Sequence, residues 1–367
     1  GFGPYLMIRH LPILDNPVFL KIRPVRYQCD ECDNHPTTSE LYSWCGRGSK
    51  TSNGLDRYIM RNLINSNVQD VSRKELISYK SLTSALERNV GHEVDWSAYK
   101  NLETIGVDEI SLKKGHRDFI TIVSAKGKSG KASIIGVLPD RLKETVKTFF
   151  NSIPKHLKRT VKTVCTDMYD GFVQAAKEVF GSQVVVVDRY HLAKLYRAPL
   201  DKLRIKEMRR LKSEITSEEY ARLEGMMWVL RRDHECLSEA DKDKLSLLYK
   251  HSPQLKEAHK HAIKLTHILN TKCSRKIAQG KMDRWILSVE NSTVTCFSTF
   301  IKTLKKHKTS LLNYFKARKN SGFVGGLNNK IKVMTRRCYG ILNLTSIFQR
   351  LQLDLGSYEK YAQIATN

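Results

Sequence analysis

Alternation of hydrophobic and polar residues is clearest between residues 104 and 138, where it predicts the centre of a β-sheet. Three apolar, β-branched runs are separated there by a basic turn and a glycine-containing loop, and they cover residues 104–112, 118–124 and 132–138. Short runs of this kind, divided by turn residues, are typical of an antiparallel meander. We therefore predict three sequential antiparallel strands.

Helical periodicity then alternates with two further strand-like runs. Residues 141–151 and 171–180 have the spacing of amphipathic helices, and the runs 161–167 and 183–188 are predicted strands. The valines at 184–187 suit a strand that is buried on both faces. Three antiparallel strands followed by strand-helix-strand crossovers form a mixed sheet covered by helices. This order predicts an α/β domain with the ribonuclease-H-like fold.

Three of these predicted strands carry an aspartate. Asp108 lies in the middle of the first run, while Asp167 and Asp188 end the two later runs. A carboxylate inside a strand is costly unless it is paired with a charge or a metal. Carboxylates at the ends of adjacent strands can hold Mg²⁺, and two such ions about 4 Å apart clamp the attacking and leaving oxygens of phosphoryl transfer. Asp108 and Asp167 are therefore predicted metal ligands, provided that their strands are neighbours.

A third carboxylate would complete such a site, and Asp188 is the local candidate. His191, one helical turn later, could orient a phosphate, a water or the aspartate itself. The alternative is structural, because Asp167 and Asp188 could each cap the helix that follows. Capping does not explain Asp108, so the pattern favours a metal site over caps alone.

The first 50 residues predict short strands around a cysteine pair. Cys29 and Cys32, in Cys-x-x-Cys spacing, would supply two thiolates of a tetrahedral zinc site, which needs two more ligands. His10, His35 and Cys45 are available, but none has the spacing of a zinc ligand, and a second pair could precede the given sequence. Two unligated surface cysteines are the alternative.

Residues 51–95 change to helical periodicity and predict a small DNA-binding domain. Two short helices joined by a tight turn outline a helix-turn-helix, whose second helix would enter the major groove. The side chains predicted to contact DNA are Lys80, Ser81, Ser84 and Arg88. A helical linker domain with a solvated basic face is the alternative.

Almost all of residues 192–319 is charged and helical in periodicity, which predicts an all-α insertion. A glycine-rich stretch then leads into a basic helix and a last helix, so that the C-terminal residues would complete the interrupted α/β domain. The predicted divisions of the chain are 1–50, 51–95, 96–191, 192–319 and 320–367.

Composition narrows the class of partner. The 367 residues include 63 Lys and Arg against 37 Asp and Glu, a net charge of +26 that is spread along the chain. Polyanions, nucleic acid first, are the natural partners of such a surface. A membrane-surface protein is the weaker alternative, because no apolar segment approaches the roughly 18 residues of a membrane span. Eight cysteines with one close pair, and no signal-peptide pattern, favour a reducing cytoplasm.

Several separated motifs resemble the ISL-three family of bacterial insertion-sequence DDE transposases. They are HLPILDNPVFLKIRPVRYQCDEC, IGVDEISLKKGHRDF, VCTDMYDGF, VVVDRYHLAK and SGFVGGLNNKIK with RRCYG, and they span nearly the whole chain. The resemblance implies a cut-and-paste transposase that binds terminal inverted repeats, with an N-terminal zinc-binding segment, a helix-turn-helix and a ribonuclease-H-like core interrupted by a helical insertion. The family's first and second catalytic aspartates correspond to Asp108 and Asp167, and its Asp-Arg-aromatic-His element to Asp188 and His191.

One position departs from the family pattern. The family's catalytic glutamate corresponds to Gly325, which has no side chain to ligate a metal, and residues 312–353 contain no Asp or Glu. With two carboxylates the second metal ion would bind weakly and activity would fall steeply. We therefore predict that the chain binds transposon ends but cleaves DNA poorly or not at all. The alternatives are a silent end-binding protein that represses an active relative, and a hydrolytic nuclease or recombinase of the same fold.

Side chains outside the helix-turn-helix are also predicted to contact DNA, with a solvated basic face as the alternative for each basic one. They are Lys113, Lys114, His116 and Arg117 in the turn of the meander, and Asn328, Lys330, Lys332, Arg336 and Arg337 near the C-terminus.

The expected cofactor is Mg²⁺ or Mn²⁺, with Zn²⁺ on Cys29 and Cys32 only if further ligands lie upstream. Because the sequence starts at Gly1 rather than Met, we expect that an upstream segment is missing. The expected partners are double-stranded transposon ends, target DNA and a second copy of the chain, in the bacterial cytoplasm at the nucleoid and away from membranes.

Overall fold

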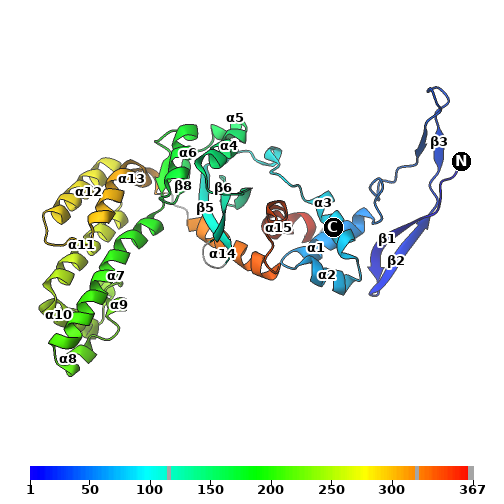
Figure 1. The fold of residues 1–367 in the computed structure, drawn as a ribbon. Coiled ribbons are helices and arrows are strands. Elements are labelled where there is room, and N and C mark those ends of the chain that lie inside the picture. Colours follow the sequence, from blue (N-terminus) through cyan, green and yellow to red (C-terminus); the bar gives the residue numbers. More distant parts are fainter. Residues whose placement is uncertain (114–116, 319–321, 363–367) are drawn as a thin grey trace. The chain divides into compact units, whose positions relative to one another are not determined.

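A computed structural model describes residues 1–113, 117–318 and 322–362 (Figure 1). The predicted DNA contacts Lys114 and His116 lie outside the described residues, and so do the side chains of Lys113 and Arg117. The chain divides into two compact units. The first unit comprises residues 1–100, 109–140 and 325–367, and the second comprises residues 101–108 and 141–324.

The central feature is a five-stranded mixed sheet with the strand order β7-β6-β5-β8-β9. The predicted meander is present as β5 (Thr104–Lys113), β6 (Arg117–Lys126) and β7 (Ala132–Leu138), in which β6 and β7 pair antiparallel. The later strands, β8 (Thr163–Thr166) and β9 (Val185–Val187), are parallel to each other, and β8 is parallel to β5. The predicted mixed α/β fold is therefore confirmed, and its strand order fits a ribonuclease-H-like domain.

Within the second unit, strands β8 and β9 are the most deeply buried part of the sheet. Every residue of both strands is buried, as the run of valines predicted. Helices α4 (Lys143–Ser152) and α6 (Asp170–Phe180) pack against each other, and α13 (Ser298–Ala317) packs along β9. The buried Asn313 amide on α13 donates to the carbonyl oxygens of Ser182 and Val185, at 2.8 and 2.9 Å. Helix α13 thereby satisfies backbone groups beside the edge strand, which limits pairing with other chains.

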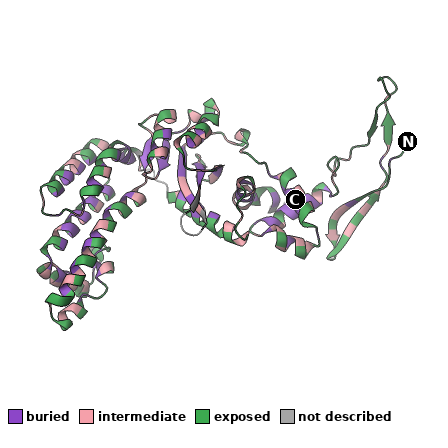
Figure 2. Cartoon of the chain, in the orientation of Figure 1, coloured by how far each residue is buried: buried purple, intermediate pink, exposed green. Residues whose placement is uncertain are grey.

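The rest of the second unit is helical. Helix α7 (Arg189–Glu214) begins directly after β9 and runs without a break past residue 192, where the insertion was predicted to start. It is followed by α8 (Ser217–Arg222), α9 (Met226–Val229), α10 (Glu239–His251), α11 (Pro253–Asn270) and α12 (Arg275–Glu290). One apolar core runs from Cys165 and Val186 in the sheet into these helices, whose inner faces are buried and outer faces exposed (Figure 2).

The first unit contains two hairpins and a three-helix bundle. The hairpins are β1 (Leu6–Ile13) with β2 (Asn16–Ile22), and β3 (Arg26–Gln28) with β4 (Thr37–Ser39). The bundle consists of α1 (Asn53–Leu63), α2 (Val68–Glu75) and α3 (Tyr79–Asn89). We predicted two helices here, and the middle one was missed because it is only eight residues long and buries only Val71. Only three residues separate α2 from α3.

The C-terminal helices of the first unit are α14 (Gly322–Arg337) and α15 (Leu344–Gly356). Helix α15 closes the core of the bundle, to which Leu353 contributes. The buried guanidinium of Arg350 donates to the Leu63 carbonyl oxygen at 2.8 Å. Short helical turns complete the chain, at α5 (Lys155–Lys158), η1 (Trp96–Ala98), η2 (His234–Cys236) and η3 (Tyr358–Ala362). Among the described helices, none has the length and apolar character needed to cross a bilayer.

Candidate functional site

The three predicted aspartates lie side by side across neighbouring strands: Asp108 is in the middle of β5, while Asp167 and Asp188 directly follow the carboxyl ends of β8 and β9. The registers of β5 with β8 and of β8 with β9 pair Val107 with Thr166, and Thr166 with Val187. Asp108, Asp167 and Asp188 each follow directly after these paired residues. Since neighbouring strands are about 4.8 Å apart, the backbones of Asp108 and Asp167 are within reach of one small ligand. The pairing extends to Asp188, whose amide donates to the Thr166 carbonyl oxygen at 2.8 Å.

Burial changes abruptly at these positions. Val107, Thr166 and Val187 are buried, whereas Asp108, Asp167 and Asp188 are half-buried. The carboxylates therefore sit where the sheet core ends and solvent begins. This placement lowers the cost of keeping them charged, compared with a position inside the core.

Two of the aspartates also bond to the backbone. Asp188 caps α7, as the structural alternative predicted, whereas Asp167 is not the cap of α6 and instead holds the turn before it. An Asp167 carboxylate oxygen accepts the amide of Tyr169 at 2.9 Å, just before α6 begins. An Asp188 carboxylate oxygen accepts the amide of Tyr190 at 3.1 Å and caps α7. Each of these contacts involves one carboxylate oxygen. Asp167 and Asp188 therefore both contribute to local folding at this edge of the sheet.

Arg189, which the sequence reasoning passed over, ties this edge of the sheet to the helical region. Its guanidinium donates to the side-chain oxygen of Asn270 at 2.6 Å and to the Tyr314 hydroxyl at 3.2 Å. Arg318 lies over the same Tyr314 ring, 5.1 Å from its centre. The half-buried His191 lies in the first turn of α7, so its ring is carried by the helix that Asp188 caps.

Helix α13 brings two further side chains to the loop after β8. Lys306 forms an ion pair with Asp170, three residues after Asp167, and His307 Nε2 lies 3.6 Å from the same carboxylate. His307 is buried, and this burial lowers the pKa of its imidazole although Asp170 acts in the opposite direction. More than 130 residues separate Asp170 from Lys306. No local pattern could have predicted the pairing, although α13 is basic and free of acids.

The oxygen ligands suit a hard divalent cation, but they are few. Mg²⁺ is commonly held by one or two carboxylates and retained waters, so Asp108 and Asp167 fit one ion. Nowhere in the described ranges do three or more His, Cys, Asp or Glu side chains gather in a way that could hold a metal.

Gly325 lies within α14 and is exposed. A β-carbon at this position would meet no atom within 4 Å, and the same holds for Gly326. Gly171, after Asp167, is different, since a β-carbon there would lie 2.6 Å from the Tyr169 ring. Packing thus requires glycine at position 171 and does not require it at position 325.

The predicted DNA contacts on α14 fall into two groups. Lys330, Lys332 and Arg336 are exposed, whereas Asn328 is buried and Arg337 is half-buried. The Arg337 guanidinium forms an ion pair with Asp354, which is only 8% exposed, and donates to the Ser66 carbonyl oxygen. Arg337 therefore holds α14 to other parts of the first unit.

The predicted contacts on α3 are divided in the same way. Lys80 is exposed, and Ser84 is half-buried. The Ser81 hydroxyl lies 2.9 Å from that of Ser78, at the start of the helix. Arg88 forms an ion pair with the buried Asp56 of α1 at 2.9 Å. Arg88 thus stabilises the bundle, and the DNA contacts of α3 stay a prediction.

The cysteine pair lies on the segment between β3 and β4. The sulfurs of Cys29 and Cys32 are 3.1 Å apart, and hydrogen bonding from the Cys32 thiol lowers the pKa of Cys29. Of the other candidate ligands, His10 bonds to the Ser52 hydroxyl and His35 to the Cys29 carbonyl oxygen. Burial raises the pKa of the Cys45 thiol, which disfavours the thiolate. The two thiols lie close together, and the zinc site stays a prediction.

Known proteins are similar to this chain over most of its length. A family model of ISL3 DDE proteins, described as a transposase, matches residues 105–351. The transposase for insertion sequence element IS1001 of Bordetella parapertussis is 26% identical over 357 residues, which are 94% of this chain and 83% of that protein. The transposase for insertion sequence element IS1557 of Mycobacterium tuberculosis is 23% identical over 281 residues, 71% of this chain and 62% of that protein.

Proposed function

Since this chain belongs to the ISL-three family of insertion-sequence DDE transposases, we propose that it binds the terminal inverted repeats of an insertion sequence. We propose further that its strand-cleaving and strand-transfer chemistry is impaired by Gly325. The observation that carries the catalytic part is the alignment of Asp108, Asp167 and Asp188 on three neighbouring parallel strands.

In this proposal Asp108 and Asp167 hold a divalent cation, Mg²⁺ or Mn²⁺. When bound, such an ion supplies a Lewis acid for the scissile phosphate and lowers the pKa of a bound water. Asp167 keeps its carboxylate oriented through the amide of Tyr169. Asp188 fixes the start of α7, and His191 in the first turn of that helix orients a phosphate oxygen or a water.

Gly325 explains why cleavage would be weak. The family places its catalytic glutamate at this position, and the exposed surface of α14 here offers no carboxylate. Gly325, Lys332 and Arg336 are spaced by seven and four residues, which puts them on one face of the helix. A glutamate at position 325 would thus share a face with two cations that can hold DNA phosphates.

Binding to DNA in this proposal uses the first unit. Helices α2 and α3 act as a helix-turn-helix, with Lys80 and Ser84 toward the major groove. The exposed cations Lys330, Lys332 and Arg336 contact phosphates, as Lys113, Lys114, His116 and Arg117 would. Zinc on Cys29 and Cys32, a homodimer that pairs two ends, and action at the nucleoid of the bacterial cytoplasm complete the proposal.

The test is a pair of measurements on the whole chain with duplexes that carry the repeats flanking its gene. Footprinting should show protection of the repeats, and cleavage with Mg²⁺ or Mn²⁺ should be slow or absent. Protection without preference for the repeats would remove the proposed binding role. Multiple turnover with either ion would contradict the proposed impairment.

The second candidate function is a silent end-binding protein that competes with an active relative. The absence of any packing demand for glycine at position 325 favours it, because the loss of the glutamate there leaves the fold intact. Adding this chain to an active relative should then inhibit excision in proportion to its occupancy of the repeats.

A further inference from the structure

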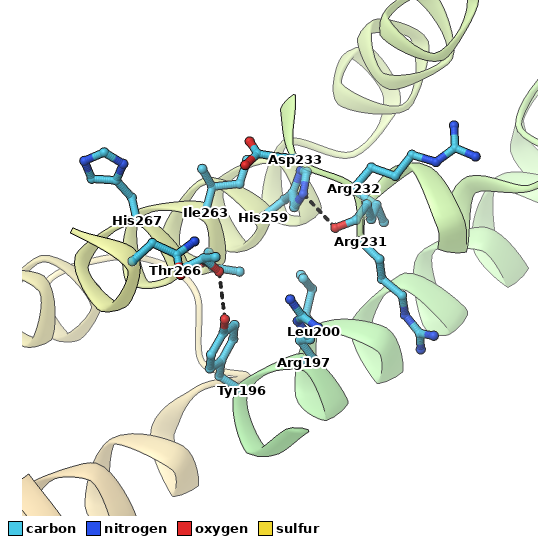
Figure 3. A pocket seen from close by; sticks show the side chains of 13 residues that line it. Tyr196, Arg197, Leu200, Arg231, Arg232, Asp233, His259, Ile263, Thr266 and His267 are labelled. Atoms are coloured by element: carbon cyan, nitrogen blue, oxygen red, sulfur yellow. Dashed lines mark hydrogen bonds between the residues drawn. The ribbon is translucent and has the colours of Figure 1, made fainter. Parts of the chain in front are cut away.

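A cleft of about 300 Å³ opens in the helical part of the second unit. It is formed by residues 196–200 of α7, residues 230–233 after α9 and residues 259–270 of α11, and we call it the insertion cleft (Figure 3). Its volume is at the small end of the range for ligand pockets. A ligand of this size is one small organic group, and a whole base pair would not enter.

The rim of the insertion cleft is positively charged. Arg197, Arg231 and Arg232 line it, against the single carboxylate of Asp233. Arg232 is paired with Asp241 at 2.9 Å, while Arg231 is 3.8 Å from its carboxylate partner. Within the part of the chain that the structure describes, no ion pair involves Arg197, which is exposed. The rim therefore suits an anion.

The interior of the cleft is uncharged. Leu200 and Ile263 form part of its wall, and the buried ring of His259 lies beside Ile263 (Figure 3). His259 Nε2 donates to the Leu230 carbonyl oxygen at 3.0 Å, and its Nδ1 lies 2.7 Å from the Tyr249 hydroxyl. Burial raises the pKa of Tyr249 to about 12, so this hydroxyl keeps its proton at neutral pH. The cleft thus combines an apolar interior with a cationic mouth.

Helix α7 and one hydrogen bond connect the cleft to the edge of the sheet where Asp188 lies. Helix α7 starts at its cap Asp188, and Arg197 follows nine residues later, about 13 Å along the axis. Asn270, which lines the cleft, accepts a hydrogen bond from Arg189, the neighbour of Asp188. About four stacked nucleotides cover 13 Å at roughly 3.4 Å each.

We propose that the insertion cleft binds one nucleotide of an unpaired DNA strand, a few nucleotides from the point of reaction. Arg197 and Arg231 contact its phosphate, and its base lies between Leu200 and Ile263. A cationic groove with apolar surface for the base is the usual design of single-strand sites. This inference rests on the proposed function only in taking DNA as the substrate. A free mononucleotide carries the same chemistry and is the alternative source.

The test compares binding by the whole chain of a labelled oligothymidine strand, thymidine monophosphate and a blunt duplex. The double variant Arg197→Ala, Arg231→Ala should weaken binding of the strand about ten-fold, through two lost phosphate contacts, and leave the duplex nearly unchanged. Arg209→Ala is the matched control, because Arg209 is an exposed arginine on the same helix outside the cleft. Ile263→Trp, which keeps every charge and fills the interior of the cleft, should weaken binding of the strand to a similar extent.

A strand that contains photoreactive thiothymidine locates the contact. Crosslinks should fall in residues 196–200, 230–233 or 259–270 and should disappear in Ile263→Trp. Equal losses in Arg209→Ala and in the double variant, or crosslinks only elsewhere, would overturn the cleft as a strand site. Tight binding of the monophosphate alone would assign the cleft to a free nucleotide and reject the strand. Failure of the wild-type chain to bind the duplex would count against the proposed function. The crosslinks test the cleft independently of that result.

Discussion

The aspartates Asp167 and Asp188 and position 325 of α14 differ in what a carboxylate at each position contributes to the fold. Asp167 and Asp188 each accept a backbone amide as well as standing at the candidate site, so their removal would disturb the starts of α6 and α7. A β-carbon at position 325 would meet no atom within 4 Å, so the fold does not depend on which residue stands there. A side chain that serves only catalysis can be lost without changing folding stability. A side chain that also stabilises the start of a helix cannot be lost without a cost in stability. The presence of Asp167 and Asp188 is therefore weaker evidence for activity than a glutamate at position 325 would have been.

The largest expected effect is a gain of cleavage in Gly325→Glu. The new carboxylate would complete the site, and we expect at least a 100-fold increase, about the size of one lost electrostatic contact in an active site. Cleavage of a repeat-containing duplex in Mg²⁺ measures it. Gly326→Glu is the matched control, since it adds the same charge one residue away on a different face of the helix. An equal gain in both variants would show that position 325 is not special.

Substitutions of Asp167, made in the Gly325→Glu variant, should distinguish its role in cleavage from its hydrogen bond to the backbone. Asp167→Asn keeps an oxygen for the Tyr169 amide and removes the charge, so cleavage should fall about 100-fold at unchanged stability. Asp167→Ala should lose the same activity and also about 1 kcal/mol of stability. Rates and urea denaturation together give both numbers. Full activity in Asp167→Asn would exclude the carboxylate as a metal ligand.

Arg336 and Arg337 provide the same contrast on one helix. Arg337→Ala should cost about 2 kcal/mol of folding stability, because it leaves the nearly buried Asp354 with a weaker partner. Arg336→Ala should change stability by less than about 0.5 kcal/mol. It should instead reduce the slope of DNA affinity against salt by about one. Similar stability losses in the two variants would refute this division.

Glycines 171 and 325 extend the comparison to packing. Gly171→Ala should destabilise the protein by about 1–3 kcal/mol, because the new methyl group collides with the Tyr169 ring. Gly325→Ala should stabilise it by about 0.5–1 kcal/mol through better helix propensity. Thermal melts of both variants measure these changes in stability. A stabilised Gly171→Ala would mean that the Tyr169 ring moves aside freely.

The smallest expected effect concerns pH. Burial lowers the pKa of His307 in the folded state, against the effect of Asp170 and with that of Lys306 and Lys177. The unfolded chain therefore takes up this proton more readily, and stability is lost as pH falls below about 6.5. His307→Gln should reduce the fall in melting temperature between neutral and mildly acidic pH by about 2 °C. Identical pH profiles for both proteins would remove His307 as a contributor.

Much of the fold and part of the site could be predicted from the sequence. The three strands of the meander and the two that follow appear at the predicted places, because alternation and valine runs record burial residue by residue. Asp108, Asp167 and Asp188 stood out because polar residues at the ends of apolar runs are visible locally. Family membership followed from the same motifs. The short helix α2 was missed because too few of its residues are buried.

Local sequence could not assign the partners of charged side chains. Arg88 and Arg337 were predicted to face DNA, yet their guanidinium groups hold Asp56 and Asp354, more than 15 residues away in the chain. Lys306 and His307 reach Asp170 from a helix that the sequence placed in a separate insertion. Both outcomes depend on distances between elements, which periodicity does not encode.

The sequence by itself determined that one apolar run carries an aspartate and that two later runs end on one, because the hydrophobic pattern is a local record of burial. Only the tertiary structure decided that these ends are in register, that position 325 is open to a larger side chain, and that three arginines surround one cleft. Those facts arise from strand pairing and helix packing between segments distant in the chain, and they set which charges meet and which remain exposed to solvent.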